Sequence, residues 1–255
     1  MQILISNDDG VHARGIDVLA KKISQTFGIV VIAPDRDCSA ASHSLTLDNP
    51  IRLTELNNGY ISVKGTPTDC VHMAITGYLK TKPDMVVAGI NNGANLGDDV
   101  LYSGTVAAAI EGRALGFPAI AISLVSQKGE FVHYETAAEI GYQIILRIQK
   151  APLPTDTILN INVPDLPLSE IKGIEVTRLG CRHSSENMVK LKDPRGQEIY
   201  WVGEPTPEQD AGPGTDFYAI KKQFISITPL KIDLTDYSAL DNLSQWVKNG
   251  NLVSH

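Results

Sequence analysis

Short apolar runs alternate with stretches whose apolar residues recur at helical spacing, and this alternation constrains the fold more than any other feature. The first run, Ile3–Ile5, stops at the polar Asn7-Asp8-Asp9-Gly10. Apolar residues then recur every three or four positions between Gly15 and Phe27, and a β-branched run follows at 29–33. A strand, a helix and a second strand within this length predict a βαβ unit, with parallel strands and a right-handed crossover.

The alternation continues to about residue 164 and predicts a doubly wound α/β domain with a mostly parallel, Rossmann-like sheet. We expect helices over 68–79, 106–115 and 136–148, and strands over 85–88, 119–122 and 158–163. Two short apolar runs at 51–54 and 60–63 flank Asn57-Asn58-Gly59, which is typical of a hairpin.

After Pro164 the pattern changes, because Gly- and Pro-rich connections separate isolated strand-like runs. We expect strands at 174–179, 198–202 and 224–228, and an amphipathic helix near 238–247. The sequence therefore predicts a catalytic domain over 1–165, followed by β-rich arms and a C-terminal helix over 166–255.

Composition excludes several classes of protein. The 255 residues are 43% hydrophobic, with a formal net charge of −7, which argues against a disordered chain and against a protein that coats duplex nucleic acid. No apolar run approaches the ~18 residues of a membrane span, and no signal-peptide pattern opens the chain. The three cysteines have neither zinc-site nor redox spacing. We expect a cytoplasmic protein.

Polar segments follow three of the expected strands, at 7–10, 35–39 and 89–99. Ligands of open parallel sheets bind at the carboxyl ends of the strands, so we expect these segments to converge on one edge. Asp8 and Asp9 stand out there, because adjacent like charges raise each other's pKa unless a cation separates them. Carboxylate, amide and hydroxyl oxygens favour Mg²⁺ or Mn²⁺. The alternative is that both aspartates cap a turn and face water.

Two further segments have both a binding and a structural interpretation. Ser103-Gly104-Thr105 opens an expected helix and could cradle phosphate with backbone N–H groups and hydroxyls, or Ser103 could simply cap that helix. The asparagine-rich loop 89–99 could bind metal or phosphate, or be a loop rich in turns. Among the histidines, His12 and His43 lie in or near the expected site. Each could act there as an acid, a base or a phosphate contact, or could be a surface residue.

Seven ordered segments together resemble the SurE (survival protein E) family, and they span almost the whole chain. They are Asn7-Asp8-Asp9-Gly10, Ala33-Pro34-Asp35-Arg36 with Ser39, Gly65-Thr66-Pro67-Thr68-Asp69-Cys70, Gly89-Ile90-Asn91 with Asn95-Leu96-Gly97, Ser103-Gly104-Thr105-Val106-Ala107-Ala108-Ala109, Asn160-Ile161-Asn162-Val163-Pro164, and Asp210-Ala211-Gly212-Pro213-Gly214-Thr215-Asp216.

The resemblance implies a metal-dependent phosphatase that hydrolyses 5′- and 3′-nucleoside monophosphates to nucleoside and phosphate, with polyphosphate as a further substrate of some members. It implies a divalent cation, Mg²⁺ or Mn²⁺, with metal ligands at Asp8, Asp9, Ser39 and Asn91. Asp8 and Asp9 are also the expected catalytic residues. The implied substrate contacts are Asn95, Ser103, Gly104 and Thr105.

The family also implies homodimers or homotetramers held by exchanged C-terminal arms, which gives residues 166–255 a role in assembly. Two positions depart from the family pattern. Arg14 stands where Pro is common, and Cys38 stands where Arg is common. Neither is an expected ligand, but Cys38 removes a positive charge near the expected anion site.

Two alternatives to this function differ in testable ways. A haloacid-dehalogenase-like phosphatase also places aspartates after its first strand, but it needs them two residues apart, and Asp8 and Asp9 are adjacent. A non-catalytic nucleotide-binding module would bind phosphate without releasing it. A free-phosphate assay on nucleoside monophosphates with Mn²⁺ separates these interpretations.

Overall fold

The computed structural model describes residues 1–126, 129–182, 188–203 and 206–249. Its main sheet has nine strands in the order β3-β4-β2-β1-β5-β6-β7-β11-β8. The parallel part comprises β1 (Gln2–Ser6), β2 (Gly28–Pro34), β4 (Ile61–Val63), β5 (Met85–Asn92), β6 (Ala119–Val125) and β7 (Thr157–Pro164). The doubly wound, mostly parallel sheet predicted from the sequence is confirmed.

The edges of this sheet are mixed. β3 (Leu53–Glu55) pairs with β4 in the expected antiparallel hairpin. At the other edge, β11 (Ile225–Lys231) runs antiparallel to β7, and β8 (Ile174–Val176) pairs with β11. Strands from beyond residue 165 therefore extend the main sheet, and the domain boundary at 165 stays a prediction.

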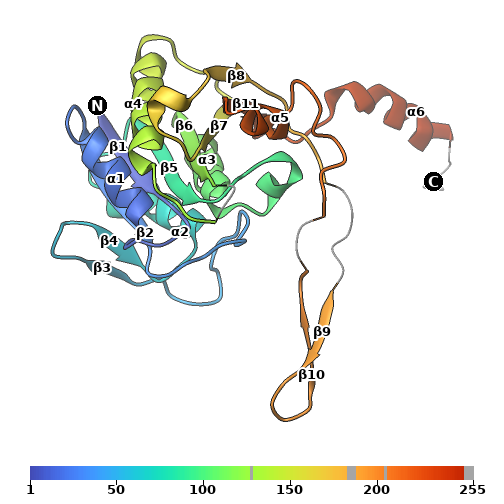
Figure 1. Ribbon diagram of the computed structural model, residues 1–255, viewed down its shortest axis with the longest axis horizontal. Coiled ribbons are helices and arrows are strands. Elements are labelled where there is room, and N and C mark those ends of the chain that lie inside the picture. The colour runs from blue at the N-terminus through green and yellow to red at the C-terminus, as the bar shows by residue number, and fades with distance from the viewer. Residues whose placement is uncertain (127–128, 183–187, 204–205, 250–255) are drawn as a thin grey trace.

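Helices cover both faces of the sheet (Figure 1). α1 (Arg14–Ile23) and α4 (Tyr134–Lys150) pack on one face, and α2 (Pro67–Met73) and α3 (Gly104–Ala114) on the other. Strand residues alternate between the two cores: Ile3 and Ile5 join the first and Leu4 joins the second. Because both faces are buried, the central strands read as continuous apolar runs.

Some elements differ from the sequence-based expectation. The helix expected over 68–79 is α2 followed by a π-helical turn, Ala74–Tyr78. α5 (Asp216–Lys221) was not predicted, because six residues are too few to show a helical period. Short 3₁₀ turns lie at Gly97–Leu101, Leu168–Glu170 and Tyr237–Ala239.

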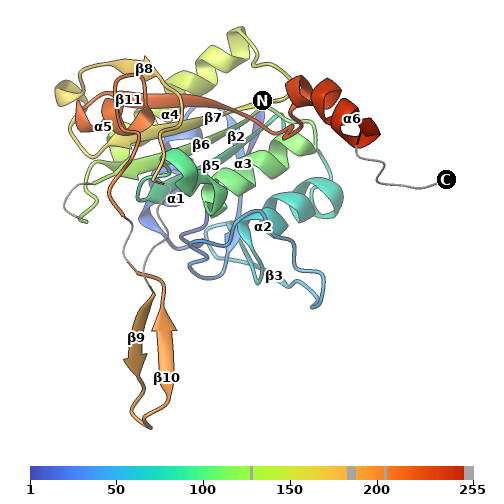
Figure 2. The same cartoon turned by 90° about the vertical axis from the view of Figure 1, so that its right-hand side faces the viewer.

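Two C-terminal elements project from the body. β9 (Val189–Lys192), which was not predicted, and β10 (Glu198–Trp201) form a separate antiparallel ribbon that extends away from the sheet (Figures 1 and 2). α6 (Leu240–Asn249) projects from the body near the end of the chain. In the described part of the chain, no helix has the length and apolar character needed to cross a bilayer.

Candidate functional site

The direction of chain winding reverses between β1 and β5. From β1 the chain proceeds outward to β2, and after β4 it returns to β5 on the other side of β1. Such a switch point leaves a crevice at the carboxyl ends of the two strands, where α/β proteins bind ligands. Asp8 and Asp9 follow β1, and Asn91 lies at the end of β5.

Asp8 is held at the N-terminus of α3. It is 4% exposed, and its Oδ1 accepts a hydrogen bond from the Thr105 hydroxyl. A Cβ added to Gly104 would lie 2.8 Å from the Asp8 Cβ, so the absence of a side chain at Gly104 allows this approach. Burial raises the pKa of Asp8, although hydrogen bonds from Thr105 act in the opposite direction. A helix N-terminus favours the negative charge.

Asp9 faces the end of β5. Its Oδ2 accepts a hydrogen bond from the Asn92 backbone N–H at 2.9 Å. Burial, with smaller contributions from the charges of Asp8 and Asp37, raises the pKa of Asp9 to about 7, although the Asn92 bond lowers it. One buried and one half-buried carboxylate, both with raised pKa values, form a site that a bound cation would stabilise.

The segment after β2 reaches the same place. The Cys38 N–H donates to the Asp8 backbone oxygen at 2.8 Å, which brings the segment that contains Ser39 to the backbone of the carboxylate pair. Ser39 is exposed, and its hydroxyl donates to Asp37 at 2.6 Å. The predicted convergence of three strand ends is therefore present, with Ser39 at its solvent side.

The loop after β5 is fixed by buried amides of β7. The Asn95 N–H donates to Asn162 Oδ1, and the Asn95 oxygen accepts from Asn160 Nδ2 and Asn162 Nδ2, at 2.8–2.9 Å. The Asn95 Nδ2 donates to the Ser123 hydroxyl at 2.8 Å. Asn91 donates from Nδ2 to the Gly93 oxygen at 3.0 Å. The structure thus ties Asn95 to the sheet.

Ser103 and Thr105 both have partners within the protein. Ser103 is the N-cap of α3, and its hydroxyl accepts from the Val106 N–H at 3.0 Å. Thr105 is fully buried and bonds Asp8. Ser103 therefore caps α3, as one of its two interpretations predicted. Thr105 instead donates its hydroxyl to the Asp8 carboxylate.

Two residues of the site carried no assigned role in the sequence. Asp216, at the start of α5, is fully buried and accepts from the Gly97 N–H at 2.7 Å and the Gly180 N–H at 2.8 Å. Asn162 anchors Asn95, as described above. The signal available for Asn162 was the Asn-Ile-Asn pattern in an otherwise apolar strand, because a buried amide needs a partner. For Asp216, no local pattern indicates a partner 119 residues away.

The donor set suits a hard divalent cation. Over the described residues, no group of three or more His, Cys, Asp or Glu side chains is placed to hold a metal ion. The oxygens at the switch point are instead carboxylate, amide and hydroxyl, which Mg²⁺ and Mn²⁺ accept. Asn7 Oδ1, adjacent to the pair, is buried without a hydrogen-bond partner. Uncompensated buried acceptors of this kind fit a cation better than an apolar or anionic group.

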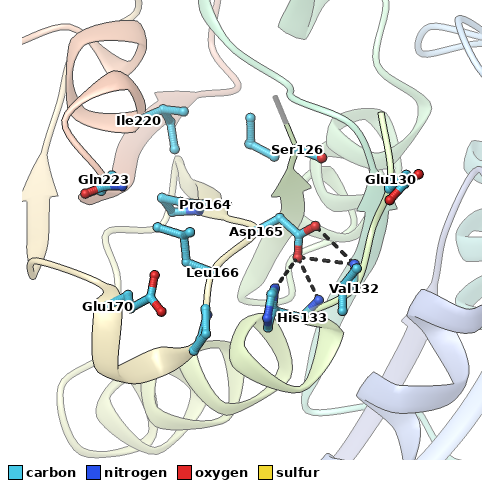
Figure 3. Close-up of a pocket in the computed structure, with 12 residues that line it drawn as sticks. Ser126, Glu130, Val132, His133, Pro164, Asp165, Leu166, Glu170, Ile220 and Gln223 are labelled. Carbon is cyan, nitrogen blue, oxygen red and sulfur yellow. Dashed lines mark hydrogen bonds and ion pairs between the residues drawn. The ribbon is translucent and has the colours of Figure 1, made fainter. Parts of the chain in front are cut away.

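A cavity of about 470 Å³ lies beyond the carboxyl ends of β6 and β7 (Figure 3). Asp165 accepts there from the His133 N–H at 2.6 Å and from His133 Nδ1 at 3.0 Å. Glu130 and Glu170 also line the cavity. Three carboxylates around one histidine make it a poor site for phosphate, so the switch point remains the candidate anion site.

The fold and this site define a class: a doubly wound α/β protein with an aspartate pair at its switch point, set against a helix N-terminus. Comparison with known proteins places the chain within that class. The family model described as Survival protein SurE matches residues 3–186. The chain belongs to the SurE family, as its motifs indicated.

Relatives match over nearly their whole length. A protein of Coxiella burnetii (strain RSA 331 / Henzerling II), named 5′-nucleotidase SurE, is 61% identical over 97% of this chain and 95% of its own. A protein of the same name from Methylococcus capsulatus is 59% identical over 97% and 98%. The crystal structure of the SurE protein from Aquifex aeolicus is similar with a TM-score of 0.85 and 40% identity, covering 96% of this chain and 99% of that one.

Proposed function

We propose that this chain is a metal-dependent 5′-nucleotidase that hydrolyses nucleoside monophosphates to nucleoside and phosphate. The observation that carries the proposal is the Asp8–Asp9 pair at the switch point, whose carboxylates both have raised pKa values, in a chain about 60% identical to proteins named 5′-nucleotidase SurE. Activity on 3′-nucleotides and polyphosphate, and Mg²⁺ or Mn²⁺ as the particular metal, belong to the same proposal.

The site residues take the following roles. Asp8, Asp9, Ser39 and Asn91 hold the cation. When bound there, a divalent cation would supply Lewis-acid chemistry: it would polarise the phosphate group and lower the pKa of a water molecule. Asp9 is the less buried carboxylate, so it orients the attacking water and accepts its proton, while Asp8 stays fixed by Thr105.

Phosphate binds at the N-terminus of α3, beside the Asp8 side chain that packs on Gly104, where the helix dipole favours an anion. Asn95 and the Ser103–Thr105 segment line this position. Their geometry is set by hydrogen bonds within the protein, so the oxygens of the phosphate meet groups that need little rearrangement. This arrangement supports hydrolysis more than a binding module without turnover.

The haloacid-dehalogenase alternative is not favoured, because the aspartates are adjacent and the family match is to SurE. The test of the proposal is phosphate release from a panel of 5′- and 3′-nucleoside monophosphates with Mn²⁺. We expect release that stops with chelator and is reduced at least about 100-fold in Asp9→Asn. Wild-type rates in chelator would reject the metal, and binding without release would favour the nucleotide-binding module.

We further propose that the chain assembles as a homodimer or homotetramer through its C-terminal arms. The β9–β10 ribbon exposes Leu191 (50%), Trp201 (62%) and other apolar side chains, and α6 exposes Leu243 (54%) and Trp246 (64%). Exposed apolar clusters on projecting elements are typical of protein interfaces. A cytoplasmic location stays a prediction from the sequence.

A further inference from the structure

Glu111, in the C-terminal half of α3, accepts hydrogen bonds from two histidines that belong to different segments. His72 of α2 donates from Nδ1 to Glu111 Oε1 at 2.6 Å, and His43 of the loop after β2 donates from Nε2 to Oε2 at 2.8 Å. Glu111 itself is 7% exposed. Burial alone would raise the pKa of Glu111, but the two histidines outweigh it and leave the pKa below its usual value. The carboxylate is thus a charged acceptor with both oxygens used.

The loop that contains His43 also contains Ser39, and its backbone is strained. Ala40 and Ser42 have φ values of 60° and 54°, a region that is unfavourable for non-glycine residues and persists only when surrounding contacts enforce it. The Ser42 N–H donates to the Tyr102 oxygen at 3.1 Å. On the far side of His43, Thr46 donates from its N–H and hydroxyl to Asp69, at 2.9 and 2.6 Å.

Both sides of the proposed metal site therefore depend on α3. At its first turn, Thr105 bonds the Asp8 carboxylate, and about two turns further on, Glu111 bonds the loop through His43. A helix of this length is rigid over two turns. The Thr105–Asp8 and Glu111–His43 contacts thus join the Asp8 carboxylate and the Ser39 loop to one helix, in addition to the direct bond from the Cys38 N–H to the Asp8 backbone oxygen. His72 uses the second oxygen of Glu111 and so limits rotation of that side chain.

We infer that Glu111 is a positioning residue: through His43 it holds the strained loop over 38–46, and with it Ser39, against the Asp8–Asp9 pair. The inference rests on the proposed function for the role of Ser39 as a ligand. The clamp itself, from Glu111 to the loop, is independent of that function and can be measured without metal or substrate.

The first experiment measures amide hydrogen exchange of the 37–50 segment in metal-free protein, for wild type, Glu111→Gln and His43→Gln. A hydrogen bond to a charged group is stronger than one between neutral groups, so we expect exchange in this segment to be at least about 10-fold faster in both variants. The matched control is His133→Gln, which removes a different histidine–carboxylate contact, that with Asp165, and His133 makes no side-chain hydrogen bond to the 37–50 segment among the described residues. Its 37–50 exchange should equal wild type.

The second experiment measures Mn²⁺ binding by calorimetry on the same proteins. We expect binding to weaken about 10-fold in Glu111→Gln and His43→Gln, and to be unchanged in His133→Gln. In the double variant Glu111→Gln/His43→Gln, the loss should equal that of Glu111→Gln within about twofold, because both substitutions remove the same contact. His43 is partly exposed, so its variant reports on the clamp even where Glu111→Gln lowers stability.

Three results overturn the inference: unchanged loop exchange in both single variants, faster exchange with unchanged Mn²⁺ binding, or additive losses in the double variant. Failure of the proposed function has a different signature. It would appear as wild-type protein that binds no Mn²⁺ and releases no phosphate, while the exchange measurement still reports on the Glu111–His43 contact.

Discussion

Thr105 and Asp8 form the contact on which the geometry of the carboxylate pair depends. The Thr105 hydroxyl is fully buried and directed at Asp8. In Thr105→Val, a side chain of the same shape, the Asp8 carboxylate loses a charge-assisted hydrogen bond worth about 1.5–3 kcal/mol. We expect calorimetry to show that Mn²⁺ binds about 10-fold more weakly, and we expect inhibition by phosphate to weaken by a smaller factor. Thr105→Ser is the control that keeps the hydroxyl. If Thr105→Val and Thr105→Ser bound Mn²⁺ equally well, the role of the hydroxyl in holding Asp8 would be contradicted.

Asp9 makes the protein sensitive to pH in the absence of metal. Its pKa is raised from 3.8 to about 7 in the folded chain, so the folded state binds this proton more tightly than the unfolded state does. The contribution of Asp9 to the free energy of unfolding is therefore largest at low pH and is lost as pH rises through about 7. Thermal unfolding in chelator should show this decline in stability with pH. In Asp9→Asn, the part of the decline that the Asp9 carboxyl causes should be absent.

The same proton competes with the cation. Because a metal binds the deprotonated carboxylate, Mn²⁺ affinity of the wild type should increase as pH rises toward about 7 and then level off. Asp9→Asn should bind more weakly and show a flatter dependence. Calorimetry at about pH 6 and about pH 8 measures both, and an affinity that is equal at the two values would contradict the assignment of Asp9.

At the scale of elements, β7 positions the loop after β5 by its side chains rather than its backbone. Asn162→Leu removes one acceptor and one donor from the buried Asn95 backbone, and each group left unsatisfied costs about 1–3 kcal/mol. We expect a lower unfolding temperature and a still larger loss of kcat/KM. Asn160→Leu is the matched variant, since it removes one bond and also a buried oxygen without a partner. It should cost less on both measurements.

The elements also show what the sequence could and could not predict. The parallel strands, the β3–β4 hairpin and the position of Asp8 and Asp9 follow from periodicity and topology, because apolar patterns and turn residues are local. The partners of those aspartates are not local: Thr105 is 97 residues from Asp8, and Asp216 is 119 residues from Gly97. The loop with Ser39 has no period at all, so its contact with Glu111 could be found only in the structure.

For the whole molecule, the exposed apolar face of α6 predicts how assembly responds to substitution. Leu243→Glu places a charge on that face, which is costly to bury in an interface. We expect light scattering to show a smaller species than wild type at equal concentration. Gln245→Glu, about half a turn away on the polar side, is the control. A monomeric wild type, or an unchanged size for Leu243→Glu, would contradict the proposed arms.

The bond between Asp216 and Gly97 has a consequence for synthesis of the chain. The ribosome delivers the chain from its N-terminus, so the carboxylate pair and α3 emerge long before the residue that fixes the start of the 3₁₀ turn Gly97–Leu101. Hydrolytic competence should therefore appear late, once α5 has been translated and has docked. Nascent or prematurely terminated chains would then contain every expected ligand and still hydrolyse no nucleotide.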